Sequence, residues 1–232
     1  MRSTEARRPP MNSLRSFVVF LLGLAIVWSA GCSKTETGQA DPAAAPASAA
    51  ASIPGPAPGQ AADPLHPVVL IETNLGAITV RLDAEKAPLT VDNFLSYVDS
   101  GFYNQTIIHQ IFKGQGIMAG GYGIDLVEKP TRIPIRNEAH NGLKNRRGTV
   151  AMVRSADAVD SARSQFFFNL ADNDALDHRD RTPEGYGYCV FGEVISGMEV
   201  LDKIAELPVH DMPQLDSTPT QPVVIKQIRR SR

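Results

Sequence analysis

His109 and Gln110 stand side by side in a run of β-branched and aromatic residues, and the segment GQGIMAGGYG, with five glycines, follows shortly after. An imidazole can transfer a proton or bind a metal, whereas a primary amide offers uncharged hydrogen-bond donors. Glycines at this density could cradle a phosphate, turn a strand or disrupt an active site. Further along the chain, Ser164 and Gln165 precede three consecutive phenylalanines. Four kinds of site are therefore open: nucleotide, metal, nucleophilic and neutral hydrogen-bonding.

The glycine segment lacks the features of a nucleotide-binding loop. No helical pattern follows it, it contains no Gly-Lys-Ser or Gly-Lys-Thr, and no acidic residue is placed to bind a ribose. We therefore expect a glycine-rich loop that lets the neighbouring strands bend sharply, as small barrels require.

The histidines and serines form neither a metal-binding motif nor a hydrolase motif. Four of the five histidines are scattered at intervals of roughly thirty residues, without paired ligand spacing. They are His109, His140, His178 and His210. The chain has no Gly-x-Ser-x-Gly elbow, and Ser164 has no paired base in its neighbourhood. We expect no metal and no other cofactor.

Charged residues of both signs are mixed along the chain. The sequence has 25 acidic and 23 basic residues, with a formal net charge of -2. A nucleic-acid-binding domain presents a basic face, so this composition argues against nucleic acid as a partner.

The first 32 residues have the pattern of a secretory signal. Arg15 precedes the uncharged stretch SFVVFLLGLAIVWSAGC, which is too short and poorly flanked for a membrane-spanning helix and ends in small residues. Its end resembles a bacterial lipobox, although Ser29 stands where that motif has leucine. The resemblance implies that Cys32 is lipidated and becomes the mature N-terminus. Cleavage with release, or an uncleaved anchor, are the alternatives.

Residues 33–66 are rich in Ala and Pro, with no large apolar residue between Ser33 and Ile53. Such a segment cannot bury enough apolar surface to offset its ordering entropy, so we expect a disordered tether. The resulting hypothesis is a domain held at a membrane of the cell envelope, facing the periplasm. The one remaining cysteine, Cys189, is expected to be a small buried hydrophobic residue.

From residue 67 to 232 the pattern is that of a mainly β domain. The runs PVVLIETN and GAITVRLD are predicted to form a hairpin. The segment APLTVDNFLSYVDSGFY has the apolar spacing of a helix, with Thr90 as its N-cap and Gly101 as its stop. A second helix is predicted for GMEVLDKIAEL. Further strands are predicted for TIIHQIF, GTVAMVR, SQFFFNL, GYCVFGEVI and QPVVIKQIR. Strands at such short intervals favour an antiparallel barrel or sandwich.

Several sequence segments of this domain resemble those of the cyclophilin family, in particular its bacterial secreted branch. The resemblance extends from about Val68 to Arg229 and is carried by RGTVAM, SQFFFNL, LDH and VFGEVISGMEV, in family order. It implies a closed eight-stranded antiparallel β-barrel capped by two α-helices. It also implies a peptidyl-prolyl cis-trans isomerase that works without metal, cofactor or covalent intermediate.

The same resemblance places a catalytic arginine directly after a histidine, where this chain has His109 and Gln110. Three further groove residues of the family are replaced downstream. Without gaps, Gln115 stands at a pocket aromatic, Gly116 at a pocket methionine, and Met118 at a glutamine that binds the substrate backbone.

Other positions of the implied groove are retained. Gln165 matches a glutamine that binds substrate backbone, and Phe167 matches the floor of the proline pocket. Leu176 matches a pocket leucine, whereas Ala175 stands where an aromatic residue is common. Tyr188 occupies a position that is histidine in many eukaryotic members. The strand expected to pair with the substrate backbone contains Val153, Arg154 and Ser155.

These residues predict a monomeric isomerase of reduced efficiency that acts on proline-containing polypeptides during folding of envelope proteins. A peptide-binding module without catalysis is the alternative, because four groove positions are replaced. A purely structural envelope lipoprotein is a third hypothesis.

Overall fold

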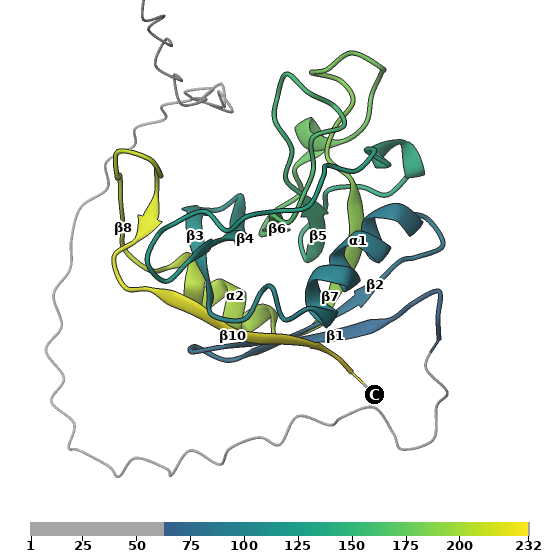
Figure 1. Cartoon of the computed structure of the whole chain (residues 1–232). Coiled ribbons are helices and arrows are strands. Elements are labelled where there is room, and N and C mark those ends of the chain that lie inside the picture. The colour runs from purple at the N-terminus through teal and green to yellow at the C-terminus, as the bar shows by residue number, and fades with distance from the viewer. Residues whose placement is uncertain (1–62, 232) are drawn as a thin grey trace, which may run out of the picture. The chain divides into compact units, whose positions relative to one another are not determined.

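A computed structural model of the chain describes residues 63–231, which form a closed antiparallel barrel (Figure 1). The strand order around it is β1-β10-β3-β4-β6-β5-β7-β2. The strands are β1 (Val68–Thr73), β2 (Ala77–Leu82), β3 (Thr106–Phe112), β4 (Gly116–Gly123), β5 (Thr149–Met152), β6 (Phe166–Asn169), β7 (Val190–Ser196) and β10 (Val223–Arg230). The eight-stranded barrel inferred from the resemblance is confirmed. The predicted signal, Cys32 and nearly all of the predicted tether lie outside the described residues.

Two α-helices accompany the barrel, as expected: α1 (Pro88–Asp99) and α2 (Met198–Ala205). The remaining elements are short: η1 (Ala139–Asn141), η2 (Asp174–Leu176), β8 (Val209–His210) and β9 (Thr218–Pro219). Strands β8 and β9 form a separate two-stranded sheet. Within residues 63–231, none of the helices has the length and apolar composition needed to cross a bilayer.

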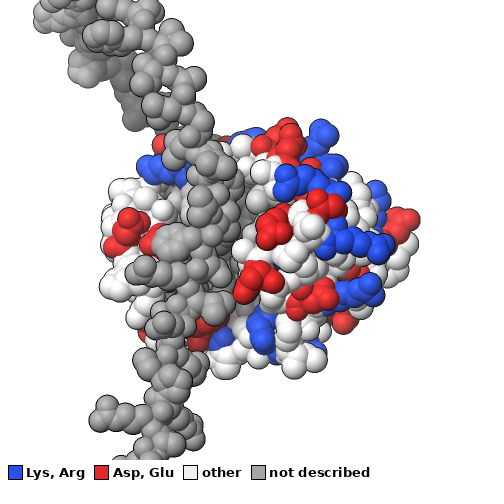
Figure 2. Space-filling view, turned by 90° about the horizontal axis from the view of Figure 1, so that it is seen from above, with Lys and Arg blue, Asp and Glu red and all other residues white. Residues whose placement is uncertain are grey.

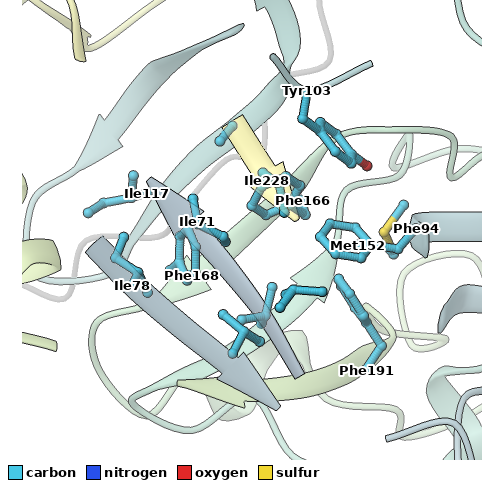
Figure 3. Close-up of a cluster of buried hydrophobic side chains, with 14 of the residues drawn as sticks. Ile71, Ile78, Phe94, Tyr103, Ile117, Met152, Phe166, Phe168, Phe191 and Ile228 are labelled. Carbon is cyan, nitrogen blue, oxygen red and sulfur yellow. The ribbon is translucent and has the colours of Figure 1, made fainter. Parts of the chain in front are cut away.

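The barrel interior is a single packed core in which aromatic rings from a helix and from strands meet (Figure 3). Phe94 of α1 lies 5.4 Å from the ring of Phe166 and 5.2 Å from the ring of Phe191, centroid to centroid. Edge-on and tilted contacts of this kind are favoured between aromatic rings. Cys189 is 2% exposed and joins this core, as predicted.

The glycine segment is a strand, so the prediction of a loop there is wrong. Strand β4 contains most of it, because β4 must lie very close to the residues around β6. A Cβ on Gly120, whose φ is +85°, would lie 2.8 Å from the Phe166 ring. A Cβ on Gly121 would lie 2.6 Å from Cγ of Gln165. Glycine is required at position 120, where φ is positive and a Cβ would also lie 2.9 Å from the carbonyl oxygen of Ser164. At position 121 a side chain would have to displace the side chain of Gln165.

Helix α1 does not begin where the sequence predicts. Thr90 is not the N-cap, since the helix starts at Pro88, and no side chain of Ala87 can cap it. The carboxylate of Glu138 takes this role from 48 residues away. It accepts hydrogen bonds from the backbone N–H of Leu89 (3.2 Å) and Thr90 (2.9 Å) and from the Thr90 hydroxyl (2.7 Å). A carboxylate satisfies the free N–H groups of a first turn and complements the helix dipole.

This cap predicts a specific loss of stability. We expect Glu138→Ala to lower the free energy of unfolding by about 2–3 kcal/mol, because it leaves the buried donors of the first turn unpaired. Urea unfolding followed by circular dichroism measures the change. The control is Glu85→Ala, at an exposed residue, which should stay within about 0.5 kcal/mol of wild type. Equal effects of the two substitutions would contradict the capping role.

Candidate active site

The strand register lines up five residues across the barrel wall. Gln110 pairs with Met118, Met118 pairs with Phe167, Phe167 pairs with Ala151, and Ala151 pairs with Val190. These residues come from β3, β4, β6, β5 and β7 in spatial order. Because neighbouring strands lie about 4.8 Å apart, the row is continuous on the sheet. It carries an amide at one end and apolar side chains along the rest.

The three consecutive phenylalanines show which face this row occupies. Phe166 and Phe168 belong to the barrel core, whereas Phe167 does not. Successive side chains of a strand point to opposite faces, so Phe167 lies on the outer face of the barrel. Phe167 is nevertheless only 4% exposed. Packing of the barrel interior therefore does not account for this residue.

Phe167 is covered by a second hydrophobic cluster, here called the outer apolar cluster. Its members are Ala151, Phe167 and Val190, with Met118, Leu143, Val153, Leu176 and Tyr188 packed against them. Five residues predicted to bind substrate thus come together at one place. The rings of Phe167 and Tyr188 meet edge to face at 5.8 Å. Leu143 is an additional member whose only signal in the sequence is one apolar side chain in the polar run NGLKN.

A buried amide network positions Leu176 and Tyr188, two of the four cluster residues that lie outside the strands. Asn145, 1% exposed, donates from Nδ2 to the carbonyl oxygen of Leu176 at 3.1 Å. The same carbonyl accepts the backbone N–H of Tyr188 at 2.9 Å. The Asp177 carboxylate accepts the backbone N–H of Asn145 at 2.8 Å. These polar residues show no regular spacing in the sequence, so pattern analysis misses them.

Arg154 contacts the cluster but its guanidinium is already satisfied. It is 8% exposed, and its Nε donates to the carbonyl oxygen of Gly187 at 2.9 Å. Its other acceptors are the carbonyl oxygens of Ser155, Ala156 and Pro183. The guanidinium carbon lies 4.9 Å from the centre of the Tyr188 ring. Arg154 therefore holds a loop against Tyr188, and its role toward substrate stays a prediction.

The backbone donors of the predicted substrate strand are also engaged. The Val153 N–H donates to the carbonyl oxygen of Gln165 at 2.9 Å, and the Ser155 N–H donates to the Ser161 hydroxyl at 2.8 Å. Pairing with a substrate would have to use the carbonyl groups of this segment or displace these bonds.

His109 lies beside the row and is buried. It is 1% exposed, its ring lies 4.7 Å from the ring of Tyr122, and its Nδ1 has no hydrogen-bond partner within residues 63–231. Burial lowers the pKa of His109 to about 4, against an opposing effect of the Ile107 backbone and of Gln165. The imidazole is therefore neutral at pH 7 and holds no charge to stabilise a substrate.

Gln110 is partly exposed, and its amide nitrogen donates to the carbonyl oxygen of Asp216 at 3.1 Å. Gly116, at the place of the expected pocket methionine, has no room for a side chain. A Cβ there would lie 2.9 Å from the carbonyl oxygen of Phe168 and 3.8 Å from the Phe167 ring. A hydrogen bond fixes the backbone of Gln115, because its carbonyl oxygen accepts the N–H of Leu170 at 2.9 Å.

This outer apolar cluster, with the amide of Gln110 at the end of its row, is the arrangement that the resemblance implies. A model of the cyclophilin type peptidyl-prolyl cis-trans isomerase/CLD family matches residues 68–230. The chain belongs to this family. Its enzyme class is accordingly that of a peptidyl-prolyl cis-trans isomerase, and the cyclophilin prediction is confirmed.

The relatives of this cyclophilin include bacterial isomerases. Peptidyl-prolyl cis-trans isomerase A of Dickeya dadantii (strain 3937) is 46% identical over 161 residues, covering 69% of this chain and 83% of that protein. Peptidyl-prolyl cis-trans isomerase B of Escherichia coli (strain K12) is 44% identical over 161 residues, covering 69% of this chain and 98% of that protein. The secreted branch remains a prediction.

Crystal structures of a cyclophilin from Cryptosporidium parvum resemble this barrel. One superposes with a TM-score of 0.59 and 27% identity, covering 72% of this chain and 98% of that chain. Another, determined in the presence of the dipeptide Ala-Pro, gives a TM-score of 0.59 and 27% identity, covering 71% of this chain and 99% of that chain.

The surface charge of the cyclophilin domain is mixed. On the face in Figure 2, basic and acidic side chains are interspersed. This face therefore presents no strong field of one sign.

The lowered pKa of His109 predicts acid sensitivity. An unfolded histidine titrates near pH 6.5, so the unfolded chain binds more protons than the folded chain between about pH 6.5 and 4. Acidification through this window should therefore remove up to about 3 kcal/mol of stability. We expect His109→Phe to lose this part of the pH dependence in urea titrations at pH 7 and pH 4.5. Retention of the wild-type slope in His109→Phe would contradict it, and His210→Phe, at an exposed histidine, is the matched control.

Proposed function

We propose that this cyclophilin accelerates X-Pro isomerisation with the amide of Gln110 as its hydrogen-bond donor, and with reduced turnover. The observation that carries the proposal is the register that places Gln110 at the end of the apolar row. The substrate class is a polypeptide segment containing proline. The Ala-Pro dipeptide present with the Cryptosporidium parvum relative supports this class.

The chemistry requires only differential binding. Rotation about the peptide bond has a barrier of about 18–20 kcal/mol, and X-Pro bonds isomerise in tens to hundreds of seconds. In the twisted state the prolyl nitrogen regains a lone pair that can accept a hydrogen bond. A donor that bonds this nitrogen only in the twisted state lowers the barrier, because it stabilises the transition state and not the planar amide.

The groove is suited to holding proline beside that donor. A proline ring on Phe167 is surrounded by apolar side chains, including Tyr188 and Leu176. Gln110 lies two strands away, at a Cα separation of roughly 10 Å, which a glutamine side chain and the width of a proline can bridge. Gln165 packs over Gly121 at the side of this row and supplies a second amide for substrate backbone.

The reduced turnover follows from charge. A neutral amide makes hydrogen bonds about half as strong as those of a charged guanidinium and lacks its rigid fork. If the twisted state is less stabilised by about 2–3 kcal/mol, turnover falls by roughly 30- to 150-fold. The absent side chain at Gly116 weakens proline binding separately.

The proposed location is the cell envelope, with the domain facing the periplasm on a lipid anchor at Cys32. This rests on the apolar stretch that ends in Ser-Ala-Gly-Cys and on the Ala/Pro-rich residues 33–66. The clients are then envelope proteins that fold through slow X-Pro isomerisation.

Restoring the charge should restore turnover. We expect Gln110→Arg to raise kcat/KM for an Ala-Pro test peptide by about 30- to 150-fold, since the charged donor binds the twisted state more strongly. We expect Gln110→Leu to lose most of the wild-type acceleration. The measurement is the cis-to-trans rate of the peptide with residues 63–232.

Phe167→Ala in both backgrounds is the control, because it removes the proline site and should lower either rate. Acceleration by neither wild type nor Gln110→Arg, with peptide binding retained, would contradict the proposal. The cyclophilin would then be a peptide-binding module.

The proposed lipid anchor predicts in which cell fraction the full chain is found when it is expressed in a bacterial host. We expect the wild-type chain in the membrane fraction, resistant to high salt, because acyl chains and not charges hold it. Cys32→Ser should block acylation, and fractionation with mass spectrometry of the N-terminal peptide detects the acyl group. Membrane retention of Cys32→Ser would instead indicate an uncleaved anchor, and soluble wild type would indicate cleavage with release.

A further inference from the structure

The side-chain amide of Gln110 has a defined orientation in this cyclophilin. The carbonyl oxygen of Asp216 can only accept a hydrogen bond, so the group that faces it at 3.1 Å must be the NH2 of Gln110 and not its oxygen. One N–H is used in this bond. The second N–H of the same nitrogen remains available to a substrate, while Oε1 is turned away from Asp216.

The carbonyl of Asp216 is held in place by the hairpin that carries β8 and β9. Figure 1 shows this hairpin beside β3. The backbone N–H of Ile111 in β3 donates to the carbonyl oxygen of Ser217 at 2.9 Å, directly next to the bond from Gln110. Residues 216 and 217 thus continue the pairing of β3 outward from β9.

The Asp211 carboxylate accepts a hydrogen bond across the bend of this hairpin. Ser217 has a φ of +53°, in the left-handed region that residues with a Cβ disfavour. Its backbone N–H donates to Oδ1 of Asp211 at 2.9 Å, across the hairpin. At the tip, Met212 and Leu215 exchange backbone hydrogen bonds. The Asp211 bond therefore stabilises the unfavourable conformation next to Asp216.

We propose that Asp211 is a positioning residue for prolyl isomerisation, because it fixes the hairpin carbonyl that orients the Gln110 amide. The inference rests on the proposed donor role of Gln110. A glutamine has three rotatable side-chain bonds and an amide that can present either its nitrogen or its oxygen. An arginine presents only donors, whatever its orientation. A chain with glutamine at this position needs an external acceptor, and Asp216 supplies it.

The test compares Asp211→Ala and Asp211→Asn in the full chain, in detergent, with an Ala-Pro test peptide. We expect Asp211→Ala to lower kcat about three- to tenfold with KM unchanged, because the apolar floor still binds proline while the donor is disordered. Asp211→Asn should retain most of kcat, since its amide oxygen can still accept from Ser217. The matched control is Asp83→Ala, which removes a similar bond to the Lys86 N–H in another loop and should leave kcat unchanged.

The same substitution in the Gln110→Arg variant distinguishes a loss of amide orientation from a general disruption of the hairpin. In Gln110→Arg, the loss caused by Asp211→Ala should shrink to less than about twofold, because the arginine needs no orienting carbonyl. In 15N-labelled chain, the side-chain NH2 signals of Gln110, assigned by their absence in Gln110→Arg, should move toward those of exposed glutamines in Asp211→Ala.

Three results would overturn the inference. Unchanged kcat in Asp211→Ala with an active wild type would refute the positioning role and leave the proposed function standing. An equal loss in both backgrounds would show a structural effect of the hairpin. Failure of wild type and Gln110→Arg alike to isomerise the peptide would refute the proposed function and, with it, this inference.

Discussion

The antiparallel register of β3, β4, β6 and β5 is the constraint on which the site depends. It brings Gln110, Met118, Phe167 and Ala151 into one row, although they are far apart in the sequence. Because strand side chains alternate, a slip of one residue in β6 would turn Phe167 into the barrel and Phe166 and Phe168 out of it. The core aromatics around Phe94 oppose such a slip, so interior packing maintains the exterior site.

The site also requires β4 to lie very close to β6 and to the residues that precede β6. This closeness explains why glycine recurs in β4. Gly120 and Gly121 leave room for the Phe166 ring and for the Gln165 side chain. The same closeness lets β4 and β6 pair through Met118 and Phe167. Glycine in this strand therefore serves both the closure of the barrel and the placement of the Gln165 side chain.

Much of the fold could be predicted from the sequence, because alternation and helical spacing are local signals. The strands around Ile71 and Phe167 and both helices follow such patterns. The features that the sequence did not predict depend on contacts between residues that are far apart in the chain. Glu138 caps a helix 48 residues away, and strand β4 is a strand only because β3 and β6 pair with it. Of the candidate site, Phe167 and Leu176 followed from family resemblance. Leu143 has only a weak signal in the sequence, and Asp216 has none, because the fold alone brings them there.

The outer apolar cluster shares no member with the barrel core. The wall of the barrel thus has two separately packed apolar faces, an inner one that forms the core and an outer one that carries the proposed site. A substitution at a partly exposed outer residue such as Gln110 leaves the packing of the core unchanged. A closed barrel that carries its proposed site on the outer face can therefore change its ligand specificity with little loss of folding stability.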